Sequence, residues 1–300
     1  MTGPSAIVVG ARGFIGTHLT AALRDRGVPA VEVTRSTAAD LSAGLRQART
    51  IFYLAGSVTP QTAEAESGRV LADHAALADF LSCCRRHGNR PAFVLVSSGG
   101  TIYDPVALPP YTESTPARPA TAYGRAKLAL EHEVLSATDC VRPLVLRLSN
   151  VYGPGQQARD GLGVIAHWLE AARDGTHPVL FGDPEVKRDY VFVGDVVQAM
   201  ARVCVRQPAQ ARICPPIINV GSGVPVSAGE VLRTVSSVVG QRLVPVVKPA
   251  RGFDRRDVWL DVARAAEALD WRPATLLGDG IERTWRAIRS GPADAGRPTP

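Results

Sequence analysis

The chain has 300 residues, of which 45% are hydrophobic, enough for one large α/β unit or for two lobes. No apolar run is long enough to span a bilayer, and no basic segment followed by an apolar one opens the chain, so we expect a soluble, cytoplasmic protein. The net charge is +6, but the basic residues are scattered without interleaved aromatic residues, which argues against a nucleic-acid groove. The five cysteines have no metal-ligand spacing, which predicts reduced packing residues and no metal site.

A glycine-rich turn lies near the N-terminus. An apolar run at residues 6–9 precedes it and a helical pattern over 17–26 follows it; the turn itself reads Gly10-Ala11-Arg12-Gly13-Phe14-Ile15-Gly16. In a strand–turn–helix unit the first glycine permits the tight turn, the second lets the backbone approach a pyrophosphate, and the third allows close helix–strand packing. Because the N–H groups and the dipole of a helix N-terminus attract negative charge, the turn predicts a dinucleotide site.

The end of the second predicted strand bears on which dinucleotide is bound. Proteins that prefer NAD carry an Asp or Glu about 20 residues after the glycine turn, to accept from the adenosine ribose. Here residues 33–36 read Val-Thr-Arg-Ser, and Glu32 lies two residues upstream, back on the strand. Arg35 and Arg12 would accommodate a 2′-phosphate, so we predict NADP(H) as the cofactor, with NAD as the alternative.

Strand-like apolar runs alternate with helical stretches, which predicts a Rossmann-type α/β fold with a doubly wound parallel sheet covered on both faces. The runs lie at residues 6–9, 30–34, 50–55, 92–97, 143–148 and 216–220, and the clearest helices at 17–26, 70–87 and 122–136.

After residue 155 the pattern changes to helices and short loops, with one return to the sheet. We predict a dinucleotide-binding domain over 1–155, completed by 188–222. A smaller, discontinuous C-terminal substrate lobe would consist of 156–187 and 223–290. Residues 291–300 are rich in Gly, Pro and Ala, which predicts a disordered tail.

Tyr123 and Lys127 stand four residues apart in a predicted helix, so their side chains leave the same face one turn apart. A Lys ammonium beside a Tyr hydroxyl favours the phenolate. Such a Tyr can pass a proton to or from a sugar or alcohol oxygen near neutral pH. This spacing is common on solvated helices, but together with the glycine turn it indicates a proton-transfer site.

Further short motifs follow in order along the chain. They are Asp40-Leu41, Phe52-Tyr53-Leu54-Ala55-Gly56, Val96-Ser97-Ser98-Gly99-Gly100-Thr101-Ile102-Tyr103, Arg147-Leu148-Ser149-Asn150-Val151-Tyr152-Gly153-Pro154-Gly155, Arg188-Asp189-Tyr190-Val191-Phe192-Val193-x-Asp195, Asn219-Val220-Gly221, Arg251-x-x-Asp254 and Leu269-x-Trp271-x-Pro273. With the turn and the Tyr/Lys pair, they resemble the extended short-chain dehydrogenases/reductases, in particular nucleotide-sugar epimerases, dehydratases and ketoreductases. The likeness runs from Ala6 to about Ile288.

The resemblance implies a role for each cofactor-site residue. Tyr123 would be the general acid/base, and Lys127 would hold the nicotinamide ribose. The residues expected along the cofactor cleft are Gly10, Arg12, Gly13, Phe14, Ile15, Gly16, Arg35, Asp40, Leu41, Leu54, Ala55, Gly56 and Ser97. Of these, Asp40 and Leu41 would lie against the adenine.

The resemblance also implies a nucleoside-diphosphate sugar as the substrate. Asn150, Arg188 and Arg251 would hold its diphosphate, since the planar fork of arginine pairs phosphate oxygens bidentately. Asp254 would lie near the substrate ribose. Homodimers through a four-helix interface are usual in the resembled family, and we expect one here.

One departure from the family pattern concerns catalysis. Such proteins place a Ser or Thr four residues before the Tyr of a Val-Tyr-Gly segment, and here that position, four residues before Tyr103, is Gly99. The hydroxyl that bonds the sugar oxygen must then come from Thr101, which we favour, or from Ser98.

Cofactor preference bears on the reaction, because a net reductase consumes NADPH from solution whereas an epimerase regenerates its bound nicotinamide at every turnover. We therefore predict an NADPH-dependent 4-ketoreductase of a keto-deoxysugar, with an NAD-dependent nucleotide-sugar 4-epimerase as the alternative. A dehydratase is disfavoured because the turn at Gly99-Gly100-Thr101 has no carboxylate. A non-catalytic NADP-sensing protein would not need the Tyr123/Lys127 pair.

Overall fold

The computed structural model describes residues 5–34, 41–158, 162–206, 215–252 and 257–290. Its centre is a parallel six-stranded sheet with the strand order β2-β1-β3-β4-β5-β9. The strands are β1 (Ser5–Val9), β2 (Ala30–Val33), β3 (Ala48–Tyr53), β4 (Ala92–Ser98), β5 (Arg142–Leu148) and β9 (Ile217–Val220). Each overlaps one of the predicted apolar runs, and the predicted parallel α/β fold is confirmed.

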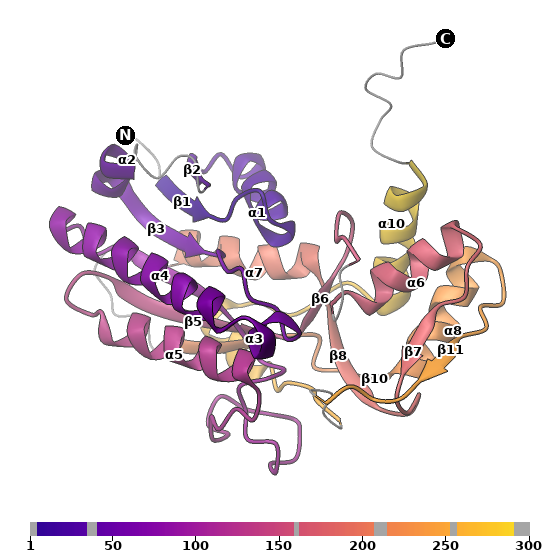
Figure 1. Cartoon of the computed structure of the whole chain (residues 1–300). Coiled ribbons are helices and arrows are strands. Elements are labelled where there is room, and N and C mark those ends of the chain that lie inside the picture. Colours follow the sequence, from indigo (N-terminus) through magenta and orange to yellow (C-terminus); the bar gives the residue numbers. More distant parts are fainter. Residues whose placement is uncertain (1–4, 35–40, 159–161, 207–214, 253–256, 291–300) are drawn as a thin grey trace, which may run out of the picture.

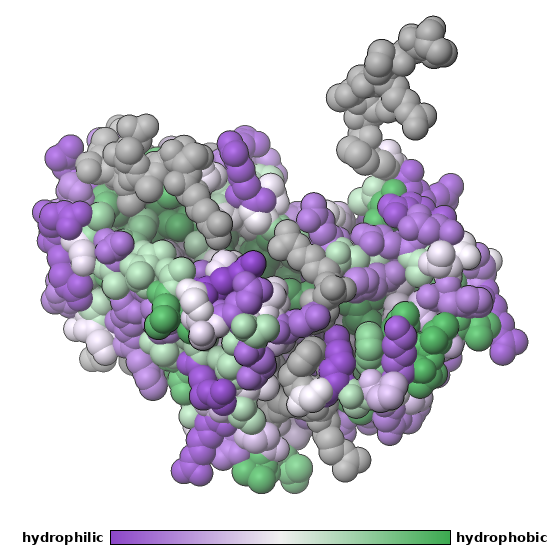
Figure 2. Space-filling model, viewed as in Figure 1, coloured by the Kyte–Doolittle hydropathy of each residue, from purple (hydrophilic) through white to green (hydrophobic). Residues whose placement is uncertain are grey.

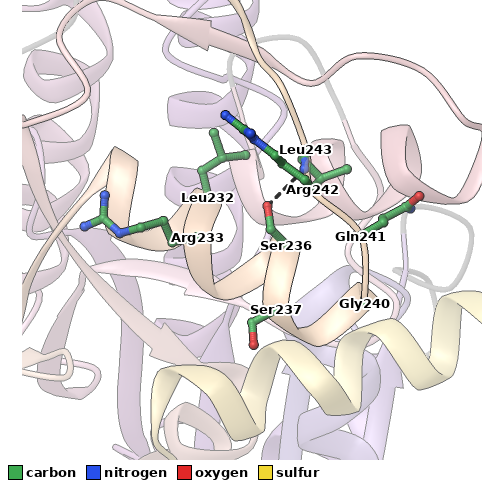
Figure 3. A pocket seen from close by; sticks show the side chains of 8 residues that line it. All are labelled: Leu232, Arg233, Ser236, Ser237, Gly240, Gln241, Arg242 and Leu243. Atoms are coloured by element: carbon green, nitrogen blue, oxygen red, sulfur yellow. Dashed lines mark hydrogen bonds between the residues drawn. The ribbon is translucent and has the colours of Figure 1, made fainter.

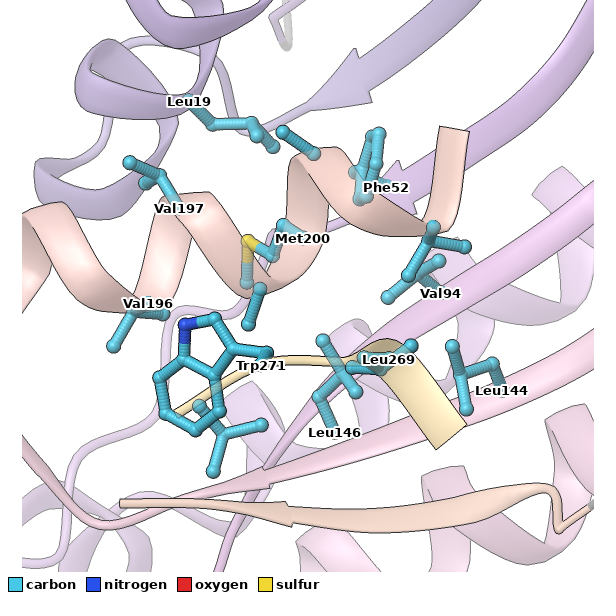
Figure 4. Close-up of a cluster of buried hydrophobic side chains, with 14 of the residues drawn as sticks. Leu19, Phe52, Val94, Leu144, Leu146, Val196, Val197, Met200, Leu269 and Trp271 are labelled. Carbon is cyan, nitrogen blue, oxygen red and sulfur yellow. The ribbon is translucent and has the colours of Figure 1, made fainter. Parts of the chain in front are cut away.

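Helices cover both faces of this sheet (Figure 1). One face packs against α1 (Phe14–Asp25), α7 (Val193–Arg206) and α9 (Ala263–Leu269), around a buried cluster that includes Leu19, Met200 and Trp271 (Figure 4). The other face packs against α2 (Leu41–Gln47), α4 (Ser67–His87) and α5 (Ala122–Ser136). A sheet buried on both faces needs mostly apolar strands. All seven residues of β5 are buried, and five of them are apolar; the other two are Arg142 and Arg147.

A smaller lobe stands beside the sheet (Figure 1). It contains the three-stranded sheet β10-β8-β6 and the parallel pair β11-β7, with helices packed around the cluster of Trp168 and Tyr152. Its elements are β6 (Asn150–Tyr152), α6 (Val164–Arg173), β7 (Val179–Phe181), β8 (Lys187–Phe192), β10 (Pro225–Ser227), α8 (Ala228–Val239), β11 (Val246–Lys248) and α10 (Leu277–Ser290); the short α3 (Thr62–Ala65) belongs to the larger unit.

The segment 188–222 divides between the two sheets. Residues 188–192 lie in β8, which pairs with β6 and β10 and not with the central sheet. The chain returns to the larger unit through α7 and β9, which pairs with β5. The β8 strand, followed directly by α7, therefore connects the smaller lobe to the larger unit.

The surface is mixed in character. On the face drawn in Figure 2, polar and apolar residues are interspersed, and an apolar area lies at the edge of the smaller lobe near β7 and β11. Among the described residues, no helix is long and apolar enough to cross a bilayer.

Candidate active site

The glycine turn packs α1 closely onto the end of β1. Gly10 has φ +88°, and its N–H donates to the carbonyl of Val33 at 3.0 Å. A Cβ on Gly16 would lie 2.2 Å from the Gly10 carbonyl oxygen, so only glycine fits there. The first turn of α1 has no acidic residue, and its N-cap residue Gly13 has no side chain that could cap the helix. The N–H groups at the start of α1 are therefore not capped by a side chain, and such a helix N-terminus can bind an anion such as a pyrophosphate.

The end of β3 lies directly against this turn. A Cβ on Gly10 would come 3.1 Å from the backbone of Leu54 and Ala55. Leu54 and Ala55 are half-buried, and Gly56 is exposed. The predicted cleft residues of the two strands are thus brought together along one edge of the sheet.

The described part of the β2 end contains no carboxylate that faces this turn. Glu32 lies within the strand opposite Val8, and its carboxylate is 3.9 Å from the guanidinium of Arg24. Arg12 is exposed in the glycine turn. Arg35 and Asp40, which the sequence places at the cofactor, lie outside the described residues, and Leu41 begins α2.

Tyr123 and Lys127 lie one turn apart near the start of α5, as the sequence predicted, and both are half-buried. The Thr121 hydroxyl caps this helix by accepting from the N–H of Gly124 at 3.1 Å. The Lys127 Nζ is 5.8 Å from the centroid of the Tyr123 ring, and it lies 3.5 Å from the point that a Cβ on Gly56 would occupy. The ammonium therefore reaches from α5 to the predicted cofactor cleft.

Ser97 supplies an independent sign that this edge receives a ligand. The residue is 4% exposed, and its hydroxyl has no hydrogen-bond partner among the described residues. A buried hydroxyl without a partner is costly. A dinucleotide in the cleft could satisfy it, so the residues present fit the predicted cofactor.

The first turn of α5 also rests on the loop after β4. A Cβ on Gly124 would lie 2.4 Å from the carbonyl oxygen of Thr101. In that loop the Thr101 hydroxyl donates to the Ser98 hydroxyl at 3.0 Å, and both residues are half-buried. The contact brings the Tyr123 helix and the two candidate hydroxyls together.

Replacing Gly124 by alanine should lower the melting temperature and turnover. Overpacking against a fixed carbonyl costs about 1–3 kcal/mol, more than the roughly 1 kcal/mol that alanine gains over glycine in a helix. The matched control is Gly68→Ala in α4, where no described atom would lie within 4 Å of the new Cβ. Calorimetry should show no decrease in the melting temperature of the control. A Gly124→Ala protein as stable as wild type would contradict the close contact between Gly124 and Thr101.

The structure explains the glycine that replaces the family hydroxyl. A Cβ on Gly99 would lie 2.6 Å from Cδ1 of Leu260, which is 1% exposed. Leu260 comes from a distant part of the chain and packs with Tyr103 and Tyr111. A side chain at position 99 is therefore excluded unless Leu260 moves, a relation that a single sequence does not reveal.

The predicted diphosphate ligands lie on or beside the smaller lobe. Asn150 is exposed on β6, and its amide donates to the carbonyl of Asp189 at 2.9 Å. Asp189 is buried and its carboxylate accepts hydrogen bonds from Ser149 and Ser222, which fixes the strand that presents Arg188. The half-buried Arg188 pairs with β10 and with Val258.

Arg251 stacks on an aromatic ring that sequence reasoning missed. Its guanidinium carbon is 4.7 Å from the ring centroid of Phe181, which is 41% exposed at the end of β7. The predicted ribose ligand Asp254 lies outside the described residues. A pocket elsewhere in this lobe, at the C-terminal end of α8, is lined by Arg233, Arg242 and their neighbours and includes none of the predicted site residues (Figure 3).

Comparisons with known proteins identify relatives of this chain. A UDP-glucose 4-epimerase of Mycolicibacterium smegmatis is 36% identical over 202 residues, which cover 66% of this chain and 62% of that protein. A dTDP-6-deoxy-L-talose 4-dehydrogenase (NAD(P)(+)) of Kitasatospora kifunensis is 33% identical over 206 residues, covering 64% and 62%. The matched part of the chain thus spans about three-fifths of the length of these relatives.

A solved structure resembles nearly the whole fold. MoeE5 in complex with UDP-glucuronic acid and NAD has a TM-score of 0.84 and 26% identity, covering 95% of this chain and 99% of that one. Residues 6–221 match the model of the NAD dependent epimerase/dehydratase family. With the glycine turn, the Tyr123/Lys127 pair and the shared fold, this match establishes that the chain belongs to the NAD dependent epimerase/dehydratase family, whose predicted resemblance is confirmed.

Proposed function

We propose that the protein is an NADPH-dependent 4-ketoreductase of a nucleoside-diphosphate keto-deoxysugar. The observation that supports this choice is the end of β2. Its one described carboxylate, Glu32, lies back on the strand beside Arg24, while Arg12 is exposed in the glycine turn. Arg12 and the following Arg35 suit a 2′-phosphate, and NADPH suits a net reduction.

The chain's own residues would divide the work as follows. The nicotinamide would supply hydride to C4 of the sugar. Tyr123 Oη would deliver a proton to the C4 oxygen. The Ser98 hydroxyl, which accepts from Thr101, would donate a hydrogen bond to that oxygen as negative charge develops. Lys127 would hold the nicotinamide ribose and keep the Tyr123 face of α5 toward it.

The substrate would be held from the smaller lobe. Asn150, Arg188 and Arg251 would bind the diphosphate, and Asp254 the ribose. The exposed ring of Phe181 beside Arg251 offers a surface for the base.

A homodimer and a cytoplasmic location are part of the proposal. The homodimer is carried over from the resembled family, in which two copies usually meet through a four-helix interface.

The second candidate is a nucleotide-sugar 4-epimerase. It is favoured by the similarity to the UDP-glucose 4-epimerase of M. smegmatis and by the NAD in the MoeE5 structure. The same residues would serve, with Tyr123 first taking the hydroxyl proton and later returning it. A non-catalytic NADP sensor is less well supported, because the Tyr123/Lys127 pair and the Ser98–Thr101 hydroxyls would have no task.

The cofactor of the purified protein separates the two candidates. We expect an empty site that binds NADPH more tightly than NADH, and turnover of nucleotide 4-keto-sugars. Arg12→Ala should raise the Kd for NADPH about tenfold, the effect of losing one charged hydrogen bond, and leave the Kd for NADH nearly unchanged. Calorimetric titration measures both, with the exposed Arg289→Ala as control. Tightly retained NAD, or a wild-type preference for NADH, would exclude the reductase and favour the epimerase.

A further inference from the structure

A buried ion pair joins the helix of Tyr123 and Lys127 to the central sheet. Glu131 lies one turn beyond Lys127 on α5, and its side chain is 1% exposed. Arg147 on β5 is 3% exposed and holds both carboxylate oxygens: Nη2 is 2.6 Å from Oε2, and Nε is 3.0 Å from Oε1. A bidentate guanidinium–carboxylate pair fixes angle as well as distance.

The same arginine contacts the loop that bears the candidate hydroxyls. Its guanidinium carbon is 4.9 Å from the ring centroid of Tyr103, which is fully buried and follows Thr101 by two residues. In the sheet, Arg147 lies in register between Ser97 on β4 and Asn219 on β9. Arg147 therefore touches both chain segments that would carry the proton-transfer groups. Its neighbour on β4 is Ser97, whose hydroxyl has no partner within the described part of the chain.

The network continues to the segment that fills the space above Gly99. The Tyr103 hydroxyl donates to Asn219 Oδ1 at 2.5 Å, and the Asn219 amide donates to the carbonyls of Tyr111 and Asp261, at 2.9 and 3.2 Å. Burial raises the pKa of the Tyr103 phenol, which stays protonated and can donate at neutral pH. Leu260 lies next to Asp261, so the ion pair, the guanidinium–ring contact and these hydrogen bonds together form a connected path from α5 to the wall of the predicted site.

We propose that Glu131 and Arg147 are positioning residues, which set the distance between the Tyr123/Lys127 face of α5 and the Ser98–Thr101 loop. A buried ion pair is poor evidence for stability, because well-packed apolar residues of similar volume often replace one without loss. Apolar residues would fill the space, but they would not fix the angle of α5. The inference rests on the proposed function, since the groups that are positioned are those assigned to proton transfer and to cofactor binding.

The double variant Glu131→Leu/Arg147→Met separates positioning from stability. We expect a melting temperature near that of wild type, an unchanged KM for the keto-sugar and a kcat about 10²-fold lower, the effect of a small misplacement of reacting groups. NADPH should bind about tenfold more weakly by calorimetry, because Lys127 moves with the helix. Arg147→Lys keeps the positive charge but cannot form the bidentate pair with Glu131. Its kcat should therefore lie between that of wild type and that of the double variant.

The control replaces an exposed ion pair, Glu282→Gln/Arg286→Met on α10, and should leave every value unchanged. Wild-type kcat and wild-type NADPH affinity in the stable double variant would overturn the proposal. Failure of both Arg147 variants to fold would also overturn it, since the pair would then serve the fold itself. If wild type binds NADPH but turns over no nucleotide keto-sugar, the proposed function fails, and the comparison of NADPH affinities still decides the positioning proposal.

Discussion

Replacing Tyr123 by phenylalanine is expected to lower kcat by about 10²–10⁴-fold, the usual worth of general acid/base catalysis. The change removes one oxygen from a half-buried ring, so packing on α5 should be retained. The melting temperature and the Kd for NADPH should therefore stay close to the wild-type values. Steady-state turnover of a nucleotide keto-sugar, measured beside calorimetric binding of NADPH, gives both quantities.

The matched control is Tyr152→Phe. Tyr152 lies in the core of the smaller lobe, where its hydroxyl donates to the carbonyl of Leu277 at 3.3 Å. Loss of that hydroxyl should cost little activity. Equal turnover of the Tyr123→Phe protein and wild type would remove Tyr123 from the mechanism, and an equal loss in both variants would point to a general effect of losing a phenol.

The central sheet could be predicted because its strands are buried on both faces. Parallel strands of this kind read as continuous apolar runs, and each of the six was placed within a few residues. The short strands of the smaller lobe left no such signal. All three residues of β11 are exposed, and β6 has only three residues, separated from β5 by the single residue Ser149. Their pairing depends on distant partners, which local periodicity does not encode.

The strand β8 shows the same limit for domain assignment. From the sequence, residues 188–222 as a whole are assigned to the dinucleotide-binding domain, but the chain pairs β8 with β6 and β10. The local sequence pattern can predict that a segment forms a strand, but tertiary contacts decide which sheet that strand joins.

The candidate site divides in a similar way. Tyr123 with Lys127, and the glycine turn, could be predicted because each depends on spacing within one turn or one loop. The contact of Leu260 with position 99 could not be predicted, because the two residues are far apart in sequence and meet only in the folded chain. For the same reason, the Glu131–Arg147 pair appears only once α5 is packed on β5.

Removing the Ser98 hydroxyl should be the second most damaging change, with kcat lower by about 10²–10³-fold, the cost of losing one donor to a developing oxyanion. The sequence favoured Thr101 for this role. In the structure, however, the Thr101 hydroxyl donates to Ser98, which leaves the Ser98 proton available for a substrate oxygen. The geometry thus favours the two hydroxyls acting in series, with Thr101 behind Ser98.

The comparison of Ser98→Ala with Thr101→Val tests this order. Thr101→Val keeps the loop filled and removes only the supporting hydrogen bond, so we expect a smaller loss of about tenfold in kcat. Thr234→Val on α8 is the control for loss of a threonine hydroxyl, and it should not change turnover. A larger loss from Thr101→Val than from Ser98→Ala would return the role to Thr101, and no loss from either would mean that Tyr123 alone polarises the carbonyl.

Gly99 provides the last test of the same arrangement. Gly99→Ser would restore the hydroxyl that the family places there, but its Cβ would meet Leu260 Cδ1 at 2.6 Å. We therefore expect the single variant to be destabilised by about 1–3 kcal/mol through overpacking, without any gain in turnover. Adding Leu260→Ala should relieve the clash, and in the Ser98→Ala background the double change should recover part of the lost kcat. Such recovery would place positions 98 and 99 at the same substrate oxygen, and its absence would restrict the role to Ser98 and Thr101.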